Sequence, residues 1–295
     1  MNRKIVIAGG TGFVGKYLAE KFIASGFEVI IISRQPRHIQ WSEPRNIVAA
    51  LENADMLINL AGKSVDCRYN EENKKEIYAS RIDTTHILGT ALLQCKNPPE
   101  LWINSSTATI YRHAEDRAMT ETNGEIGTGF SVNVATNWEK AFFSYQLPAT
   151  RQIALRMAIV LGKQGGVVPK IKNLVRFGLG GKQGRGNQMF SWIHIEDLYK
   201  AIVFLQQQKE LNGVFNTSSP NPVTNATLMQ LFRHSMKIPI GLPAPKWLLK
   251  LGAILIKTET ELILKSRWVI PERLLQSGFT FTYSHLDKAL ANVLN

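Results

Sequence analysis

The sequence predicts an α/β fold, in which a doubly wound parallel sheet is followed by a small, mostly helical C-terminal domain. Short runs of apolar, β-branched residues alternate with segments of helical periodicity along most of the 295 residues. The first run ends in a glycine-rich turn that opens a helix, and Pro239, Pro243 and Pro245 mark a later change in composition. We therefore expect residues 1–238 to form the sheet domain and residues 239–295 to form the second domain.

The first apolar run and its glycine turn carry the strongest local signal. Gly9 permits a sharp turn from strand to helix, Gly12 lets backbone approach a phosphate, and Gly15 lets the helix pack closely on the strand. A strand precedes this turn and a helix follows it, as in Rossmann-type units that bind a dinucleotide pyrophosphate at the helix N-terminus. The predicted cofactor-binding residues of the turn are Gly9, Gly10, Thr11, Gly12, Phe13, Val14 and Gly15.

The residues that follow the second predicted strand, residues 27–32, indicate whether the cofactor is NAD or NADP. The helix before it is predicted at residues 16–25 and ends at Gly26. An NAD site would place an acid after this strand, because a carboxylate accepts from the ribose 2′-hydroxyl and repels a 2′-phosphate. This chain has the hydroxyl of Ser33 and the planar cation of Arg34, which pairs with phosphate and stacks on adenine. The sequence therefore predicts NADP.

The next predicted strand, residues 56–60, ends in the small residues that a dinucleotide needs beside it. Leu60, Ala61 and Gly62 let a flat ring lie against backbone, where the adenine-ribose half of the cofactor would pass. We expect these three residues to belong to the cofactor site.

The long helix predicted at residues 71–93 carries two further candidates. Glu76 and Arg81 either face the cofactor or form ion pairs on the helix surface. A cluster of hydroxyl side chains within residues 105–111 follows the strand at 101–105, at the edge where doubly wound folds bind ligands. The other predicted elements are a helix from residue 44, a polar loop at 112–129, a helix at 130–143, a strand at 152–160, a flexible substrate-side segment at 162–188, a helix at 198–207, a strand at 214–217 and short helices at 271–275 and 285–294.

The composition is that of an ordinary globular protein, with 44% hydrophobic and 20% charged residues. We expect no signal peptide, because the first apolar segment is the strand that turns at Gly9. The apolar run at residues 247–256 is too short to span a bilayer and predicts a core or interface helix. Cys67 and Cys95 lack metal-ligand spacing, so we expect no metal site and a cytoplasmic protein with free thiols.

The formal net charge of +12 raises the question of an anionic partner. No basic helix carries interleaved aromatic residues, so we do not expect nucleic acid binding. Between Glu139 and Glu196 there is no acidic residue, whereas basic residues recur throughout. This segment either provides a positive field for a small anionic ligand or forms a solvated face. The sequence predicts no oligomeric state.

Several motifs together carry a resemblance to the extended short-chain dehydrogenase/reductase superfamily, and within it to its atypical epimerase-like branch. The chain resembles the NAD-dependent epimerase/dehydratase group in the glycine turn, in Ser33-Arg34 and in residues 59–62 and 105–111. Members of the atypical branch carry a small C-terminal domain of unknown function. The chain resembles this branch in residues 80–85, 137–139, 177–181, 191–195 with Asp197, 220–225 and 239–295.

This resemblance implies cofactor contacts at the same positions. It assigns the pyrophosphate turn to residues 9–15, the 2′-phosphate contacts to Ser33 and Arg34, and backbone contacts to Leu60 and Ala61. It also assigns cofactor contacts to the positions of Glu76, Arg81 and Val160, the last of which residue chemistry alone does not single out.

The usual catalytic set of that superfamily is incomplete here. Its Ser/Thr position matches Thr107, but its Tyr-x-x-x-Lys positions match Ala135 and Glu139. Alanine cannot transfer a proton, and a glutamate disfavours ionisation of a nearby phenol. Lys140 follows Glu139 but points about 100° away on the helix.

Three hypotheses remain. Tyr111, Glu139 or His194 supplies the proton, although each of these side chains also has a structural interpretation as core, ion pair or buried histidine. Alternatively, the protein is an oxidoreductase whose substrate assists with its own groups. In the third hypothesis, it binds NADP without turnover, as a sensor or scaffold. We expect an NADP(H)-dependent oxidoreductase or epimerase-like enzyme acting on a small anionic metabolite.

Overall fold

A computed structural model describes residues 3–245 and 264–294 of the chain. Its main sheet has six parallel strands in the order β10-β5-β4-β3-β1-β2, which confirms the predicted doubly wound α/β fold. The strands are β1 (Lys4–Ala8), β2 (Glu28–Ile32), β3 (Met56–Asn59), β4 (Leu101–Thr107), β5 (Arg151–Met157) and β10 (Gly213–Thr217).

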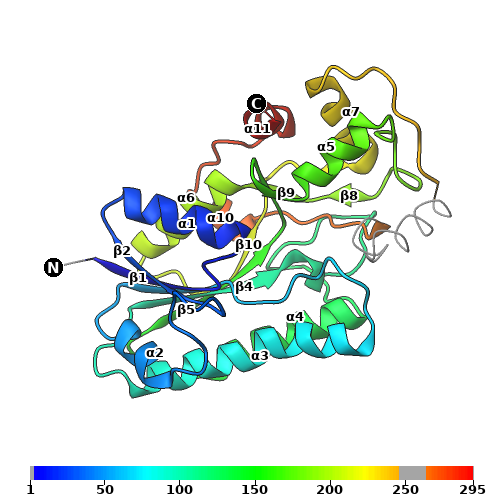
Figure 1. The fold of residues 1–295 in the computed structure, drawn as a ribbon. Coiled ribbons are helices and arrows are strands. Elements are labelled where there is room, and N and C mark those ends of the chain that lie inside the picture. Colours follow the sequence, from blue (N-terminus) through cyan, green and yellow to red (C-terminus); the bar gives the residue numbers. More distant parts are fainter. Residues whose placement is uncertain (1–2, 246–263, 295) are drawn as a thin grey trace.

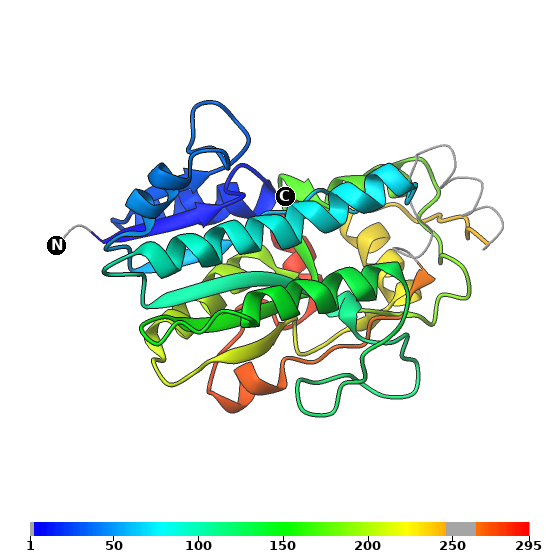
Figure 2. The same ribbon diagram turned by 90° about the horizontal axis from the view of Figure 1, so that it is seen from below.

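Helices cover both faces of this sheet (Figure 1). On β1, Ile5 and Ile7 face a core completed by α1 (Phe13–Ala24) and α6 (Ile195–Gln207). Val6 and Ala8 point to the opposite face, because successive strand residues alternate between the two faces. That face is covered by α2 (Pro44–Leu51), α3 (Glu71–Gln94) and α4 (Phe130–Phe143), and Figure 2 shows α3 and α4 running side by side across it.

Local signals determine where these helices begin and end. Gly26 has a φ of +82° and donates its backbone N–H to the carbonyl of Ile23, so it ends α1 as predicted. The Asn70 side chain accepts from the backbone N–H of Asn73 and thereby caps α3. The bounds of α4 are those predicted from the sequence.

The prediction of a single strand at residues 152–160 is wrong. β5 ends at Met157, and Ala158 donates its backbone N–H to the carbonyl of Thr217 at the end of β10. The chain then leaves the main sheet and forms a three-stranded sheet. This second sheet consists of β6 (Ile159–Gly162), β7 (Gly165–Gly166) and β9 (Trp192–His194).

The segment predicted as a flexible stretch at 162–188 contains a helix, α5 (Val168–Arg176). Val168, Ile171 and Val175 of α5 are buried in a core shared with α7 (Asn225–Ser235). The five residues between those positions are Pro169, Lys170, Lys172, Asn173 and Leu174, so the composition does not reveal the helix, which tertiary packing stabilises. The short strands β8 (Met189–Phe190) and β11 (Val223–Thr224) pair beside it.

The described part of the C-terminal segment packs onto the sheet domain. α10 (Glu272–Gln276) lies beside β10, and α11 (Leu286–Leu294) packs against α7. Leu274 and Phe279 belong to the same core as β1. The boundary at residue 238 stays a prediction, and the helix predicted at 247–256 lies outside the described residues. Within the described ranges, no helix has the length and apolarity to cross a membrane.

The glycine turn provides a test of the fold, because two of its glycines have different surroundings. A Cβ added at Gly15 would lie 2.6 Å from Gly10 Cα and 2.7 Å from the Gly9 carbonyl oxygen, which are backbone atoms. We expect Gly15→Ala to lower the free energy of unfolding by about 1–3 kcal/mol or more, measured by denaturant titration.

Gly12→Ala is the matched control. A Cβ at Gly12 would lie 3.6 Å from the Gly9 oxygen, an ordinary contact, and Gly12 has a φ of −77° that alanine adopts. We expect this variant to stay within about 1 kcal/mol of the parent protein. Equal destabilisation by both substitutions would contradict the close packing of α1 on β1.

Candidate active site

The glycine turn brings the ends of three strands together. Gly9 has a φ of +78°, and a Cβ there would lie 2.8 Å from the backbone of Leu60 and Ala61. Its N–H donates to the carbonyl of Ile32 at the end of β2, at 2.8 Å. Only glycine permits this turn to lie directly against the chain that leaves β3. The predicted residues of the turn, of Leu60–Ala61 and of the β2 end are therefore neighbours.

The N-terminus of α1 is open to a ligand. Gly12 caps it without a side-chain hydrogen bond, and the first turn has no acidic residue. Because the first backbone N–H groups of a helix lack intrahelical partners, they form a site for an anion. The space beside Gly12, which a Cβ could occupy without a clash, fits the close approach of a pyrophosphate.

The residues after β2 provide positive charge and no carboxylate. Ser33 is buried, and its Oγ accepts from the backbone N–H of Gln35 at 3.0 Å. Arg34 is exposed, and after Lys63 its charge is a smaller cause of the lowered pKa of Glu76 on α3. The larger cause is Lys63, which forms an ion pair with Glu76. Glu76 therefore lies at the same rim as Arg34, with its carboxylate paired.

A crevice of about 180 Å³ lies at the carboxyl ends of β3 and β4, between α3 and α4. Among the residues predicted for the site, it is lined by Leu60, Ala61, Gly62, Arg81 and Thr107. Ala135, which stands at the tyrosine position of the resemblance, also lines it. The remaining wall consists mainly of aromatic and hydroxyl side chains, namely Tyr69, Ser105, Ser106, Thr109, Phe130, Ser131 and Trp138.

A buried amide network shapes the wall of this crevice. Asn59 donates from Nδ2 to Asn104 Oδ1 at 2.7 Å and to Thr85 Oγ1 at 3.2 Å. Its Oδ1 accepts from the backbone N–H of Ala61 at 3.0 Å, which turns the chain away from β3. Trp138 donates from Nε1 to the same Thr85 oxygen at 2.9 Å. These bonds hold α3 and α4 at the strand ends.

Arg81 provides a partly buried positive charge in the wall. Its guanidinium donates to the backbone carbonyls of Ile77 and Lys63, at 2.9 and 3.1 Å, and lies 5.2 Å from the ring centroid of Trp138. Burial lowers the pKa of Arg81 to about 10, and the electrostatic interactions with Tyr69 and Cys67 oppose this shift. Arg81 makes no ion pair inside its own helix, which excludes the surface pairing that the sequence left open.

Tyr69 is a wall residue that sequence reasoning missed. It lies in the loop before α3, its hydroxyl is 3.5 Å from Ser131 Oγ, and its ring packs edge-on against Phe130 at 5.0 Å. Arg81 lies close enough for the two side chains to interact electrostatically. No spacing rule identifies Tyr69, because its approach to α4 depends on the path of a loop.

Glu139 and Tyr111 belong to a buried polar network behind the crevice wall. Glu139 accepts from Arg156 Nε and Nη2 at 2.8 and 2.7 Å, and from Ser106 Oγ at 2.6 Å. Arg156 Nη1 donates to the Tyr111 hydroxyl at 2.8 Å, which donates to Asn216 Oδ1 at 2.9 Å. Of these residues, Ser106 alone is among those that line the crevice.

The network holds its charges in fixed positions. Burial opposes the charge of Arg156, but the hydrogen bonds and the charge of Glu139 raise the pKa of Arg156 above its ordinary value. Burial also raises the pKa of Tyr111, despite the nearby cation. The Glu139 carboxylate thus has donors on both oxygens, and the Tyr111 hydroxyl both donates and accepts.

His194 and Val160 lie away from the crevice. His194 Nδ1 accepts from the backbone N–H of Glu196 and caps α6, while the ring stacks on Tyr283 at 3.8 Å. Burial lowers the pKa of His194, which favours its neutral form. Val160 lies on β6 and packs against the core under α1. In the described part of the chain, no cluster of three His, Cys, Asp or Glu residues could hold a metal.

The sequence is similar to those of known proteins. Residues 5–217 match the model of the NAD dependent epimerase/dehydratase family, and residues 244–293 match a domain of unknown function, DUF1731. The chain is 32% identical to epimerase family protein SDR39U1 of Mus musculus, over 99% of both chains. It is 31% identical to epimerase family protein YfhF of Bacillus subtilis, over 98% of this chain and 97% of that protein.

A solved structure agrees over the same length. The crystal structure of human epimerase family protein SDR39U1 (isoform 2) with NADPH superimposes with a TM-score of 0.90, at 31% identity and 99% coverage of both chains. The sheet, the glycine turn and the match over residues 5–217 agree with one another. The chain therefore belongs to the NAD dependent epimerase/dehydratase family.

Proposed function

We propose that this protein binds NADP(H) and catalyses hydride transfer to or from a small-molecule substrate held in the crevice. The observation that carries the proposal is the arrangement at the strand ends, where the open start of α1 lies next to a crevice with Thr107, Tyr69 and Arg81 in its wall. The first of these features suits a pyrophosphate, and the second suits a polar reacting group.

The choice of NADP rests on the end of β2. Arg34 is exposed at this position, and the hydroxyl of Ser33 lies next to it. A guanidinium forms charge-assisted hydrogen bonds with phosphate, whereas an NAD site would use a carboxylate here. The similar human protein was crystallised with NADPH, which supports the same choice.

When bound, the cofactor supplies or accepts the hydride, so the chain must bind the substrate oxygen and move a proton. Thr107 lies at the end of β4, where its hydroxyl can donate to that oxygen. We assign the proton exchange to Tyr69, which lines the same crevice, because the positive charge of Arg81 would stabilise a negative charge on the phenol oxygen. Arg81 thus takes the part that a lysine on α4 has in the superfamily pattern.

The substrate class follows from the crevice wall. Phe130, Trp138 and Tyr69 offer flat apolar surfaces, so the substrate has a body that stacks or packs against rings. Among the described lining residues, Arg81 provides the positive charge, which favours a substrate with an anionic group. The volume of about 180 Å³ limits the bound part to a small metabolite.

A second candidate function is NADP binding without turnover. It is favoured by the positions of the superfamily acid-base pair, because Ala135 has no proton to give and Glu139 is saturated by Arg156 and Ser106. Such a protein would report on the cofactor pool as a sensor or scaffold.

The cofactor proposal predicts that Arg34→Ala weakens NADPH binding by about 10-fold or more, because a charge-assisted contact to the 2′-phosphate is lost. Binding of NADH should change by no more than about 2-fold, since NADH lacks that phosphate. Arg37→Ala removes an exposed charge three residues away and serves as the control. Fluorescence titration of each protein with each cofactor measures the effect, and a parent protein that prefers NADH would refute the proposal.

The proton-transfer proposal predicts that Tyr69→Phe lowers kcat by about 100-fold or more on any substrate that the parent protein turns over. The affinity for NADPH should stay within about 2-fold, because the phenol does not serve the cofactor phosphates. Tyr145→Phe is the control, since the Tyr145 hydroxyl donates to the backbone carbonyl of His86 outside the crevice.

The measurement is the loss of nicotinamide absorbance with a panel of carbonyl metabolites and nucleotide-linked sugars. Turnover by Tyr69→Phe at the parent rate would exclude Tyr69 as the proton donor. Tight NADPH binding with no turnover by the parent protein across the panel would favour the sensor.

A structural role for Glu139 predicts a loss of stability rather than of chemistry. Glu139→Gln leaves the buried Arg156 without its counter-charge, so we expect about 3 kcal/mol of destabilisation and a Tm about 6–12 °C lower. Glu125→Gln breaks exposed ion pairs and should cost less than about 1 kcal/mol. A lower kcat with an unchanged Tm would instead make Glu139 a catalytic residue.

A further inference from the structure

Two groups of positive charges stand out in the acid-free segment between Glu139 and Glu196. Arg156, Lys170 and Arg185 form ion pairs with acids from outside the segment, namely Glu139, Asp66 and Glu115. Lys163, Lys172 and Arg176 have no such carboxylate among the described residues, and all three surround one cleft. No ion pair among the described residues neutralises these three cations.

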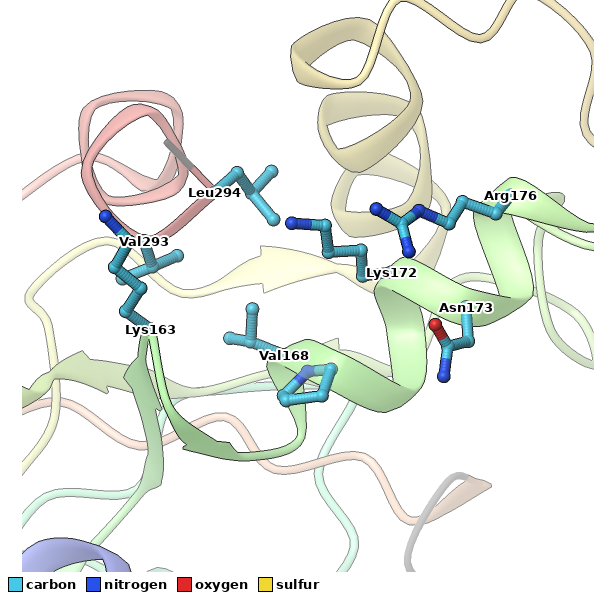
Figure 3. Close-up of a pocket in the computed structure, with 8 residues that line it drawn as sticks. Lys163, Val168, Lys172, Asn173, Arg176, Val293 and Leu294 are labelled. Carbon is cyan, nitrogen blue, oxygen red and sulfur yellow. The ribbon is translucent and has the colours of Figure 1, made fainter.

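This cleft has a volume of about 340 Å³ and lies between α5 and α11, as Figure 3 shows. Its apolar surface consists of Val168 and Pro169 of α5 and of Val293 and Leu294 of α11. In Figure 3, Lys172 and Arg176 extend from α5 toward α11, and Lys163 rises from the β6–β7 turn on the other side. An apolar floor with polar groups placed around it is typical of a small-molecule site.

The cleft is separate from the crevice at the strand ends. The two share no lining residue. On α5, the positions 169, 172, 173 and 176 form one side of the helix, whereas Lys170 lies about 100° from the centre of that side and pairs with Asp66 of the crevice loop. One face of α5 therefore lines the cleft, and a different face contacts the loop beside the crevice.

Lys172 and Arg176 are four residues apart on one helix face, where like charges destabilise the helix. Arg176 gains from its place in the last turn, but Lys172 is in the middle of α5 and only half exposed. A bound anion would neutralise both. Lysine provides a compact charge and arginine a planar fork, and this combination suits the oxygens of phosphate groups.

We propose that the cleft between α5 and α11 is a second ligand site, which binds a small molecule carrying at least two phosphate charges between Lys163, Lys172 and Arg176. Its apolar floor accepts the body of that molecule. The site is independent of the cofactor and of the substrate crevice.

Tripolyphosphate is the probe, titrated calorimetrically into the full chain at fixed ionic strength. We expect Lys163→Gln and the double variant Lys172→Gln/Arg176→Gln each to weaken its binding by about 10-fold or more. Lys170→Gln removes the same charge from another face of α5 and should change binding by no more than about 2-fold, as expected for a screened distant charge. Saturating NADPH should leave the affinity for tripolyphosphate unchanged.

Three results would overturn the proposal. The first is an equal loss with Lys170→Gln, which would mean general attraction to a basic surface. The second is displacement of tripolyphosphate by NADPH, which would place the probe in the cofactor site. The third is binding of citrate as tightly as tripolyphosphate, which would exclude phosphate as the recognised chemistry. Should the double variant fail to fold, Lys163→Gln on the exposed turn still decides between these outcomes.

Discussion

The close packing of backbone on backbone at the glycine turn is the constraint on which the rest of the site depends. Gly9 lies against the chain that leaves β3, and Gly15 lies against Gly10. Because no side chain separates these segments, the start of α1 and the exit of β3 are held next to each other. The open helix end and the wall of the crevice are consequences of that one contact.

The distribution of charge around the crevice differs from the usual arrangement of the wider superfamily. On α4, Glu139 replaces the expected lysine, and Arg156 of β5 neutralises it. The positive charge that faces the crevice comes instead from Arg81 on α3. Under the proposed function, the cation near the reacting groups therefore comes from α3 and not from α4. Tyr69, to which we assign the proton exchange, lies on a nearby loop and interacts electrostatically with this cation.

Sequence reasoning predicted the features that local chemistry determines. The alternating strands and helices, the turn around Gly9 and the end of α1 at Gly26 follow from glycine conformations and apolar periodicity. It failed where the outcome depends on distant partners. The break after Met157 follows from a hydrogen bond to Thr217, sixty residues later in the chain. Tyr69 reached the crevice through a loop path that no pattern encodes.

The packing of Leu274 and Phe279 against β1 has a consequence for how the chain folds. These residues and Ile5 belong to one core, although nearly the whole sequence separates them. During synthesis, the α1–α6 face of the sheet stays incomplete until residue 279 has left the ribosome. Contacts of such long range slow folding, because loop closure has to precede the burial that rewards it. Newly made chains therefore expose an unfinished apolar face for most of their synthesis, and chaperones that bind such faces have time to act.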